Sequence, residues 1–210
     1  MTDYKFYFRK SSFKKDLKSG KLLLDIINFN KPKNFLEIGV LEGATSRNIC
    51  ELLNIIHDGN FTFTGIDLFV DYNMKNINKE FTPISMKFSN PLKWIYFKFI
   101  IKAHPGSEKA VNFLLKKFNN SIKLYKGYSK DILKKINLKD KDFVFLDGGH
   151  SYETVKEDLN ILLNNLSNNK IIVCDDYNIP HYGVRKAVDE IKNKCYFENL
   201  GRFALLKIKK

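Results

Sequence analysis

The fold of this 210-residue chain is decided by residues 35–46, which read Phe35-Leu36-Glu37-Ile38-Gly39-Val40-Leu41-Glu42-Gly43-Ala44-Thr45-Ser46. An apolar run ends in an acid and a glycine, and a second glycine precedes a helix-prone stretch. This pattern predicts a strand, a tight turn and the N-terminus of a helix. Gly39 can adopt a positive φ and, without a Cβ atom, lets a ligand approach the backbone. Unpaired amides at the start of a helix from Gly43 suit a polar cofactor.

The turn does not have the glycine spacing of a dinucleotide-binding fingerprint, because Leu41 stands where that fingerprint has its second glycine. Beyond the turn, apolar runs alternate with amphipathic stretches, which indicates a parallel sheet with right-handed crossovers. We therefore predict one α/β domain over residues 1–210, a Rossmann-like, doubly wound, mostly parallel sheet of seven strands that ends in an antiparallel β-hairpin. Helices are expected at 17–29, 44–56, 107–118, 129–136, 152–166 and 184–192, and strands at 34–38, 61–66, 122–125, 143–146, 170–174, 195–198 and 202–208.

Residues 69–120 interrupt this alternation, and we predict that they form a mostly helical insertion that covers the acceptor site as a lid. Residues 92–102 within it are basic and aromatic, and they include Trp94, Tyr96, Phe97 and Phe99. The same stretch could instead form a dimer contact or touch a membrane surface. Residues 1–16 are also basic and aromatic, and we expect an irregular arm there.

The composition indicates a folded protein, with 44% hydrophobic and 14% aromatic residues. The net charge is +13, which allows nucleic acid or another anionic partner, although the lysines are scattered and form no long block. Cys50, Cys174 and Cys195 have neither disulfide nor zinc-site spacing. We expect a cytoplasmic protein, since no signal peptide or membrane-spanning run is recognisable.

Acids and a glycine follow the second and third predicted strands. Asp67 closes the second strand, where a carboxylate can accept hydrogen bonds from both hydroxyls of a ribose or simply cap a neighbouring segment. Gly127 follows the third strand, and Ser129 two residues later could be a helix N-cap.

The densest cluster of functional residues follows the fourth and fifth strands. The fourth strand ends in Asp147, and His150 lies three residues later with a pKa range suited to proton transfer. The fifth strand ends in Asp175 and Asp176. Because the carboxyl ends of parallel strands share one edge, three carboxylates could bind Mg²⁺ there. The alternative is that these acids cap helices and bind loops.

The order of these motifs resembles class I S-adenosylmethionine-dependent methyltransferases, in particular the macrocin-type branch of small-molecule and sugar O-methyltransferases. The resemblance rests on Glu37-x-Gly39, Asp67, Asp147-Gly148-x-His150-x-Tyr152 and Asp175-Asp176-Tyr177. It implies an S-adenosylmethionine site at Glu37, Gly39, Gly43, Asp67, Gly127 and Asp147, catalytic roles for His150 and Asp147, and metal positions at Asp147, Asp175 and Asp176. Sugar-modifying members often carry a second acid where this chain has Gly149, so the cation stays open.

The predicted reaction is methyl transfer to a hydroxyl of a small molecule or sugar, and the chain could form a homodimer. An RNA ribose methyltransferase or an RNA-binding protein is the alternative, and a steep salt dependence of RNA binding would support it. A dehydrogenase would explain Tyr182-x-x-x-Lys186, but the glycine turn argues against a dinucleotide. A non-enzymatic scaffold has no need for an acid at every strand end on one edge.

Overall fold

The computed structural model describes residues 16–69, 91–180 and 183–209 of the chain. Its sheet has seven strands in the order β3-β2-β1-β4-β5-β7-β6, with β1 to β5 parallel and β7 antiparallel to both β5 and β6. This confirms the predicted mostly parallel α/β sheet with its terminal hairpin. The elements are α1 (Leu17–Asn30), β1 (Asn34–Ile38), α2 (Ala44–His57), β2 (Thr62–Asp67), α3 (Pro91–Ile95), η3 (Tyr96–Ile101), α4 (Glu108–Leu115), η4 (Lys116–Phe118), β3 (Ile122–Lys126), α5 (Ser129–Leu133), β4 (Phe143–Leu146), α6 (Tyr152–Asn165), β5 (Ile171–Cys174), α7 (Val184–Ile191), η5 (Lys192–Lys194), β6 (Cys195–Leu200) and β7 (Phe203–Ile208).

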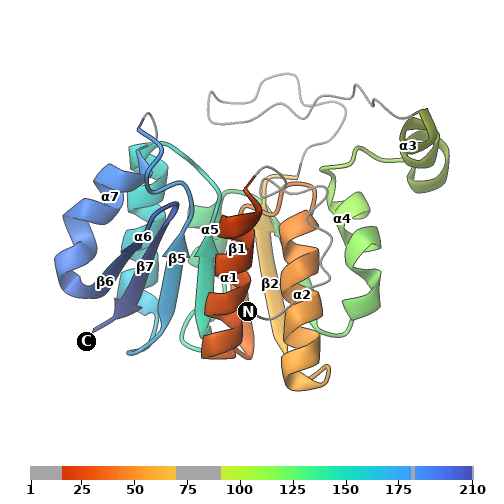
Figure 1. Cartoon of the computed structure of the whole chain (residues 1–210). Coiled ribbons are helices and arrows are strands. Elements are labelled where there is room, and N and C mark those ends of the chain that lie inside the picture. The colour runs from red at the N-terminus through yellow and green to blue at the C-terminus, as the bar shows by residue number, and fades with distance from the viewer. Residues whose placement is uncertain (1–15, 70–90, 181–182, 210) are drawn as a thin grey trace.

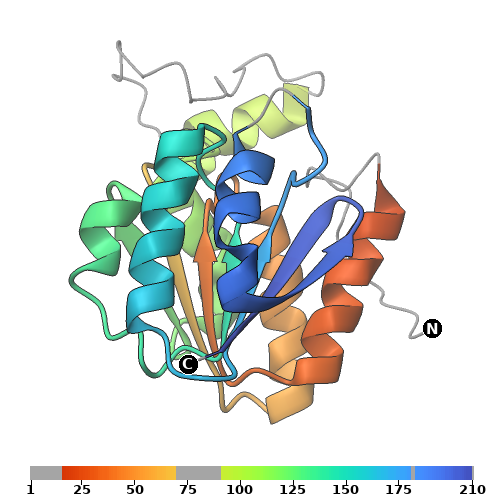
Figure 2. The same ribbon diagram turned by 90° about the vertical axis from the view of Figure 1, so that its left-hand side faces the viewer.

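Helices cover both faces of the sheet, as Figures 1 and 2 show. Successive side chains of a strand point to opposite faces, so Phe35 of β1 packs with α1 and α2, whereas Leu36 and Ile38 pack with α5, α6 and α7. The ring of Phe35 stacks between Phe63 and Phe143 of the neighbouring strands, with centroid distances of 5.9 and 5.1 Å. The doubly wound arrangement is therefore built on two separate apolar layers.

Helix α4 packs on one of these layers. Its Val111 and Leu115 are fully buried and pack against Ile122 and Leu124 of β3. Burial of these two side chains holds α4 on the sheet beside α2, where it connects β2 to β3. Figure 1 shows α3 standing outside the layer, beyond α4. That residues 69–120 cover the acceptor site as a lid stays a prediction, and residues 70–90 of that stretch lie outside the described part.

The turns that follow the parallel strands are joined into one edge by main-chain hydrogen bonds. The amide of each residue just past one strand donates to a carbonyl at the end of its neighbour, so the ladder continues beyond the strands. These bonds are Gly39 to Ile66, Asp147 to Ile38, Asp175 to Leu146 and Gly127 to Asp67, with lengths of 2.9, 2.8, 3.0 and 2.9 Å. Open α/β sheets bind ligands at this edge, and the acids of the sequence motifs lie along it.

Candidate active site

The two glycines of the β1 turn are both required by packing. Gly39 has a φ of +96°, and a Cβ atom built on it would lie 2.0 Å from the carbonyl oxygen of Asp147. Gly43 has a φ of +74°, and its Cβ would lie 2.9 Å from Cγ1 of Val111 in α4. The space that Gly39 leaves is thus filled by the loop after β4, not open to a ligand as the sequence suggested.

Asp67 closes β2 with its carboxylate turned toward the β1 turn. Its Oδ2 accepts hydrogen bonds from the amides of Val40 and Leu41, each at 2.8 Å, and its Oδ1 accepts one from Phe69 at 2.8 Å. Leu41 has a φ of +53°, a left-handed conformation that is unusual for a non-glycine residue. The carboxylate therefore fixes the turn, and it lies where the sequence predicted a partner for ribose hydroxyls.

Glu37 is a fully buried acid beneath the same turn. The hydroxyl of Ser46 at the start of α2 donates to its Oε2, whereas Oε1 has no hydrogen-bond partner among the described residues. Burial raises the pKa of Glu37 to about 8; the hydrogen bond from Ser46 opposes this rise, and the nearby Asp67 carboxylate adds to it. Glu37 is therefore largely protonated at neutral pH, and its second oxygen is left to serve a ligand or a bound water.

Gly127 and Ser129 lie at the end of β3, next to Asp67. Gly127 has a φ of +151° and donates its amide to the carbonyl of Asp67 at 2.9 Å. Ser129 is the first residue of α5, and the N-cap position is taken by Tyr128, whose side chain makes no capping bond. The suggestion that Ser129 caps this helix is therefore wrong, and the edge here is shaped by main chain.

The three acids after β4 and β5 come together as predicted. Asp147, Asp175 and Asp176 each offer a carboxylate oxygen within 4.8 Å of the other two. Burial and the two neighbouring carboxylates hold the pKa of Asp147 well above its usual range. Burial and Asp175 also raise the pKa of Asp176, while Arg202 and His150 lower it. So close a group of acids needs a compensating cation or donors.

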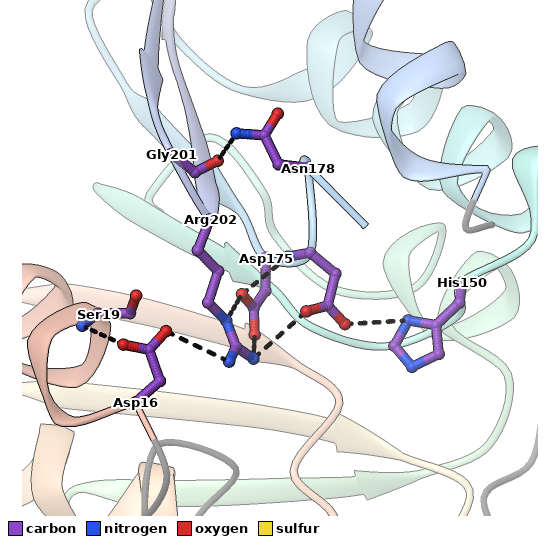
Figure 3. A network of polar contacts seen from close by, with 8 residues as sticks. Asp16, Ser19, His150, Asp175, Asn178, Gly201 and Arg202 are labelled. Atoms are coloured by element: carbon purple, nitrogen blue, oxygen red, sulfur yellow. Dashed lines mark hydrogen bonds and ion pairs between the residues drawn. The ribbon is translucent and has the colours of Figure 1, made fainter. Parts of the chain in front are cut away.

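The compensating cation is Arg202, which the sequence analysis missed. Its Nε and Nη2 donate to the two oxygens of Asp175 at 2.5 and 2.6 Å, and Nη2 lies 3.3 Å from Oδ1 of Asp176 (Figure 3). Arg202 ends the turn of the hairpin, and because β7 is antiparallel to β5 it falls opposite the residues that follow Cys174. The register between β5 and β7 would have placed Arg202 beside Asp175 and Asp176. That register can be used only when it is known that the hairpin pairs with β5.

His150 approaches the same cluster from the loop after β4. Its Nδ1 lies 3.8 Å from Oδ2 of Asp176, within ion-pair range when the ring is protonated (Figure 3). The main-chain carbonyl of His150 accepts a hydrogen bond of 2.7 Å from Gly183 at the start of α7. The structure thus brings His150, Asp147 and Asp176 to one place, with the side chain of His150 partly exposed.

The tyrosines of the two motifs are structural. The hydroxyl of Tyr152 donates to Glu190 of α7, and that of Tyr177 donates to Asp189, each at 2.8 Å. Tyr152 therefore attaches α7 to the start of α6, and Tyr177 attaches it to the loop after β5. Tyr182 lies outside the described residues, and Lys186 lies above the ring of Tyr152, 4.1 Å from its centroid.

The basic aromatic segment at α3 and η3 has a partly exposed apolar surface. Phe99 and Ile100 are 57% and 64% exposed, and Nζ of Lys98 lies 4.4 Å above the ring of Trp94. In the described part of the chain, no helix is both long and apolar enough to cross a bilayer. A lid, a dimer contact and membrane-surface binding stay predictions for this segment.

Comparisons with known proteins agree with the fold. A family model described as a methyltransferase domain matches residues 36–177. Similar solved structures include an O-methyltransferase from Bacillus cereus in complex with SAH (TM-score 0.60, 14% identity, covering 91% of this chain and 81% of that one). They also include the O-methyltransferase TomG from Streptomyces achromogenes in complex with SAM (0.61, 14%, 92% and 80%). A third is CalS11, a TDP-rhamnose 3'-O-methyltransferase of calicheamicin biosynthesis (0.60, 16%, 97% and 83%). No curated protein matches the chain.

Proposed function

Because the chain belongs to the methyltransferase-domain family, we propose that it transfers a methyl group from S-adenosylmethionine to a hydroxyl of a small molecule or sugar. The observation that carries this proposal is the continuous edge on which Asp67 and Gly127 lie beside the β1 turn while Asp147 and His150 lie beside the same turn on its other side. A donor and an acceptor bound along this edge would meet at the loop after β4. Of the solved structures with this fold, one contains SAH, another contains SAM, and a third is by name a TDP-rhamnose O-methyltransferase, which supports the proposal.

The proposed cofactor site uses the residues expected from the sequence, namely Glu37, Gly39, Gly43, Asp67, Gly127 and Asp147. When bound, the cofactor supplies a methyl group already activated by its sulfonium. Asp67 would accept ribose hydroxyls with the lone pairs that its three amide donors leave over. Neutral Glu37 would offer a proton donor toward the turn. The glycines would act by shaping the turn.

The proposed acceptor site lies on the β4–β5 side. Methyl transfer to an alcohol requires positioning of the oxygen and removal of its proton, and His150 is the base within reach of this edge. Asp176 would hold the ring with Nδ1 toward its carboxylate, 3.8 Å away, so that Nε2 faces the acceptor. Asp147, whose pKa is raised by burial and by the two neighbouring carboxylates, would form a hydrogen bond with the acceptor hydroxyl.

The expected Mg²⁺ site does not fit this donor set. Both oxygens of Asp175 are bound by Arg202, and one of them also accepts the amide of Asp176 at 2.8 Å. A cation would have two carboxylates left, Asp147 and Asp176, unless the guanidinium moved away. Binding and deprotonation of the acceptor are therefore assigned to the chain's own residues.

The cofactor site is tested by calorimetry with S-adenosylhomocysteine. We expect wild type to bind it, and Asp67→Ala to lose about 1–3 kcal/mol of binding free energy because charge-assisted hydrogen bonds are removed. Asp140→Ala is the matched control, since Asp140 is exposed and precedes β4 at the opposite edge. If NADH stabilised the protein thermally and S-adenosylhomocysteine did not, the proposal that S-adenosylmethionine is the methyl donor would be rejected.

The base is tested by turnover of a panel of sugar nucleotides and phenols with labelled methyl donor. His150→Gln should lower kcat strongly and leave the affinity for S-adenosylhomocysteine unchanged, because the ring is proposed to act on the acceptor alone. A variant with full kcat would remove His150 from the mechanism.

A further inference from the structure

We propose that the guanidinium of Arg202 occupies the place where the sequence predicted a divalent cation, and that it is the positioning residue for Asp175 and Asp176. This inference rests on the proposed function, since it concerns the acceptor side of that site.

Arg202 binds both carboxylate oxygens of Asp175, so neither oxygen is left without a donor from the protein. The side chain of Asp175 is 1% exposed, and it receives two parallel donors from one planar group, at 2.5 and 2.6 Å. Such bidentate pairs are the strongest and most directional of carboxylate interactions. The amide of Asp176 adds a third donor at 2.8 Å. Both oxygens of the carboxylate are thus engaged by donors of the protein.

Arg202 is itself held by its main chain and by its side chain, and Figure 3 shows the ion pairs of its guanidinium with Asp16 and Asp175. Its carbonyl accepts the amide of Tyr177 at 2.9 Å, which fixes the hairpin turn against the end of β5. Its Nη1 lies 4.0 Å from Oδ2 of Asp16, and Oδ1 of Asp16 caps α1 by accepting the amide of Ser19. The guanidinium therefore occupies a position set by β5, β7 and α1 together.

This arrangement assigns different tasks to the two adjacent acids. Asp175 binds the guanidinium with both oxygens, whereas Asp176 presents Oδ1 to Arg202 at 3.3 Å and Oδ2 to His150 at 3.8 Å. Asp176 has a φ of +57°, a left-handed conformation that is unusual for a non-glycine residue. Arg202 thereby fixes the carboxylate of Asp176, which orients His150. The positive charge of the Arg202 guanidinium balances the negative charge of the neighbouring acids.

The test is a titration of Mn²⁺ followed by electron paramagnetic resonance, with the full chain and no cofactor or acceptor. We expect wild type to show no site tighter than the exposed background, and Asp176→Asn to leave the titration unchanged. Arg202→Gln should create one site at least tenfold tighter than any in wild type, because three carboxylates then face each other without a cation. The double variant Arg202→Gln/Asp175→Asn should lose that site. Arg185→Gln, an exposed arginine on α7, is the matched control.

Two results would overturn the inference. One is a stoichiometric Mn²⁺ site in wild type that Asp175→Asn abolishes, since a cation would then displace Arg202. The other is a folded Arg202→Gln protein without any Mn²⁺ site. If Arg202→Gln does not fold, the wild-type and Asp176→Asn titrations still decide between the two arrangements. Because the readout involves no methyl donor, a failed S-adenosylhomocysteine titration would reject the proposed function separately.

Discussion

The two halves of the carboxyl edge hold their acids by different means. On the β1–β2–β3 side, Asp67 is bound by three main-chain amides and Glu37 by one hydroxyl. On the β4–β5–β7 side, Asp175 is bound by a guanidinium and Asp176 lies between that group and an imidazole. The first half relies mainly on main-chain amides, with one side-chain hydroxyl at Glu37, whereas the second depends on the side chains of Arg202 and His150.

The difference predicts how each half responds to change. A main-chain amide still donates its hydrogen bond when the side chain of its residue is substituted. The β1–β2–β3 half is therefore suited to bind a ligand that all relatives share. A side-chain cation can be replaced by another residue or by a metal ion, so the second half can vary between relatives. The buried acids also differ in their partners, because Glu37, whose pKa burial raises to about 8, receives one hydroxyl, whereas Asp175 is paired with a guanidinium.

The largest effect is expected at the contact between the halves. In Gly39→Ala the new methyl group would lie 2.0 Å from the carbonyl oxygen of Asp147, at a φ of +96°. Main chain on both sides must move, and we expect a loss of more than about 4 kcal/mol of unfolding free energy in urea. Gly201→Ala is the control, because Gly201 has a φ of +77° but open space around it, and should cost only about 1–2 kcal/mol. Equal losses in the two variants would show that the halves are not in tight contact.

The second prediction removes the cation of the β4–β5–β7 half. Arg202→Gln leaves the Asp175 carboxylate buried without its charged partner, and we expect a loss of about 3–5 kcal/mol of unfolding free energy at pH 7. Arg185→Gln also removes an arginine near an acid, Asp189 at 3.7 Å, but the arginine side chain is 63% exposed. That control should change stability by less than about 1 kcal/mol. A mild effect of Arg202→Gln would mean that Asp175 is readily solvated or neutralised.

The third prediction concerns the neutral acid of the other half. Glu37 has a folded pKa of about 8 against an ordinary value of 4.5, so between these pH values the native state binds a proton that the unfolded state does not. Stability from this group is therefore fully present below pH 4.5 and is lost as pH rises to 8. Glu37→Gln removes the ionisation, and it should match wild type near pH 5 and exceed it by on the order of 3 kcal/mol at pH 9. Parallel stability–pH curves for the two proteins would contradict a raised pKa.

Most of the fold could be predicted because each apolar run of four to six residues is bounded by a glycine, a proline or an acid. The acids Asp67, Asp147, Asp175 and Asp176 were placed correctly on one edge, since parallel strands bring their carboxyl ends together. Arg202 could not be placed, because its position depends on the pairing of β7 with β5, a contact between distant segments.

Other misses have the same physical origin. Gly39 in the sequence predicts a turn, but it does not indicate which group fills the space beside the glycine. In the structure that group is the main chain of Asp147. Helix α4 has an apolar face that the sequence shows, but its contact with β3 could be found only in the structure. Ser46 became relevant only when α2 brought it over Glu37. Sequence patterns thus located the helices and strands, whereas the contacts between residues on different elements could be identified only in the structure.

The last prediction removes the hydrogen-bond partner of an acid in the β1–β2–β3 half, as Arg202→Gln does in the other half. Ser46→Ala deletes the only hydroxyl that donates to Glu37 among the described residues and leaves the acid without a hydrogen bond from a side chain. We expect a loss of about 1–2 kcal/mol of unfolding free energy at pH 6, less than for Arg202→Gln, because a neutral acid in an apolar site needs less compensation than a carboxylate. Urea unfolding of the two variants at the same pH gives the comparison directly. The loss in Ser46→Ala should grow as the pH approaches 8, where Glu37 begins to ionise and the hydroxyl stabilises the charged form. A loss as large as that of Arg202→Gln at pH 6 would show that Glu37 is charged there, and the two halves would then hold the same kind of acid.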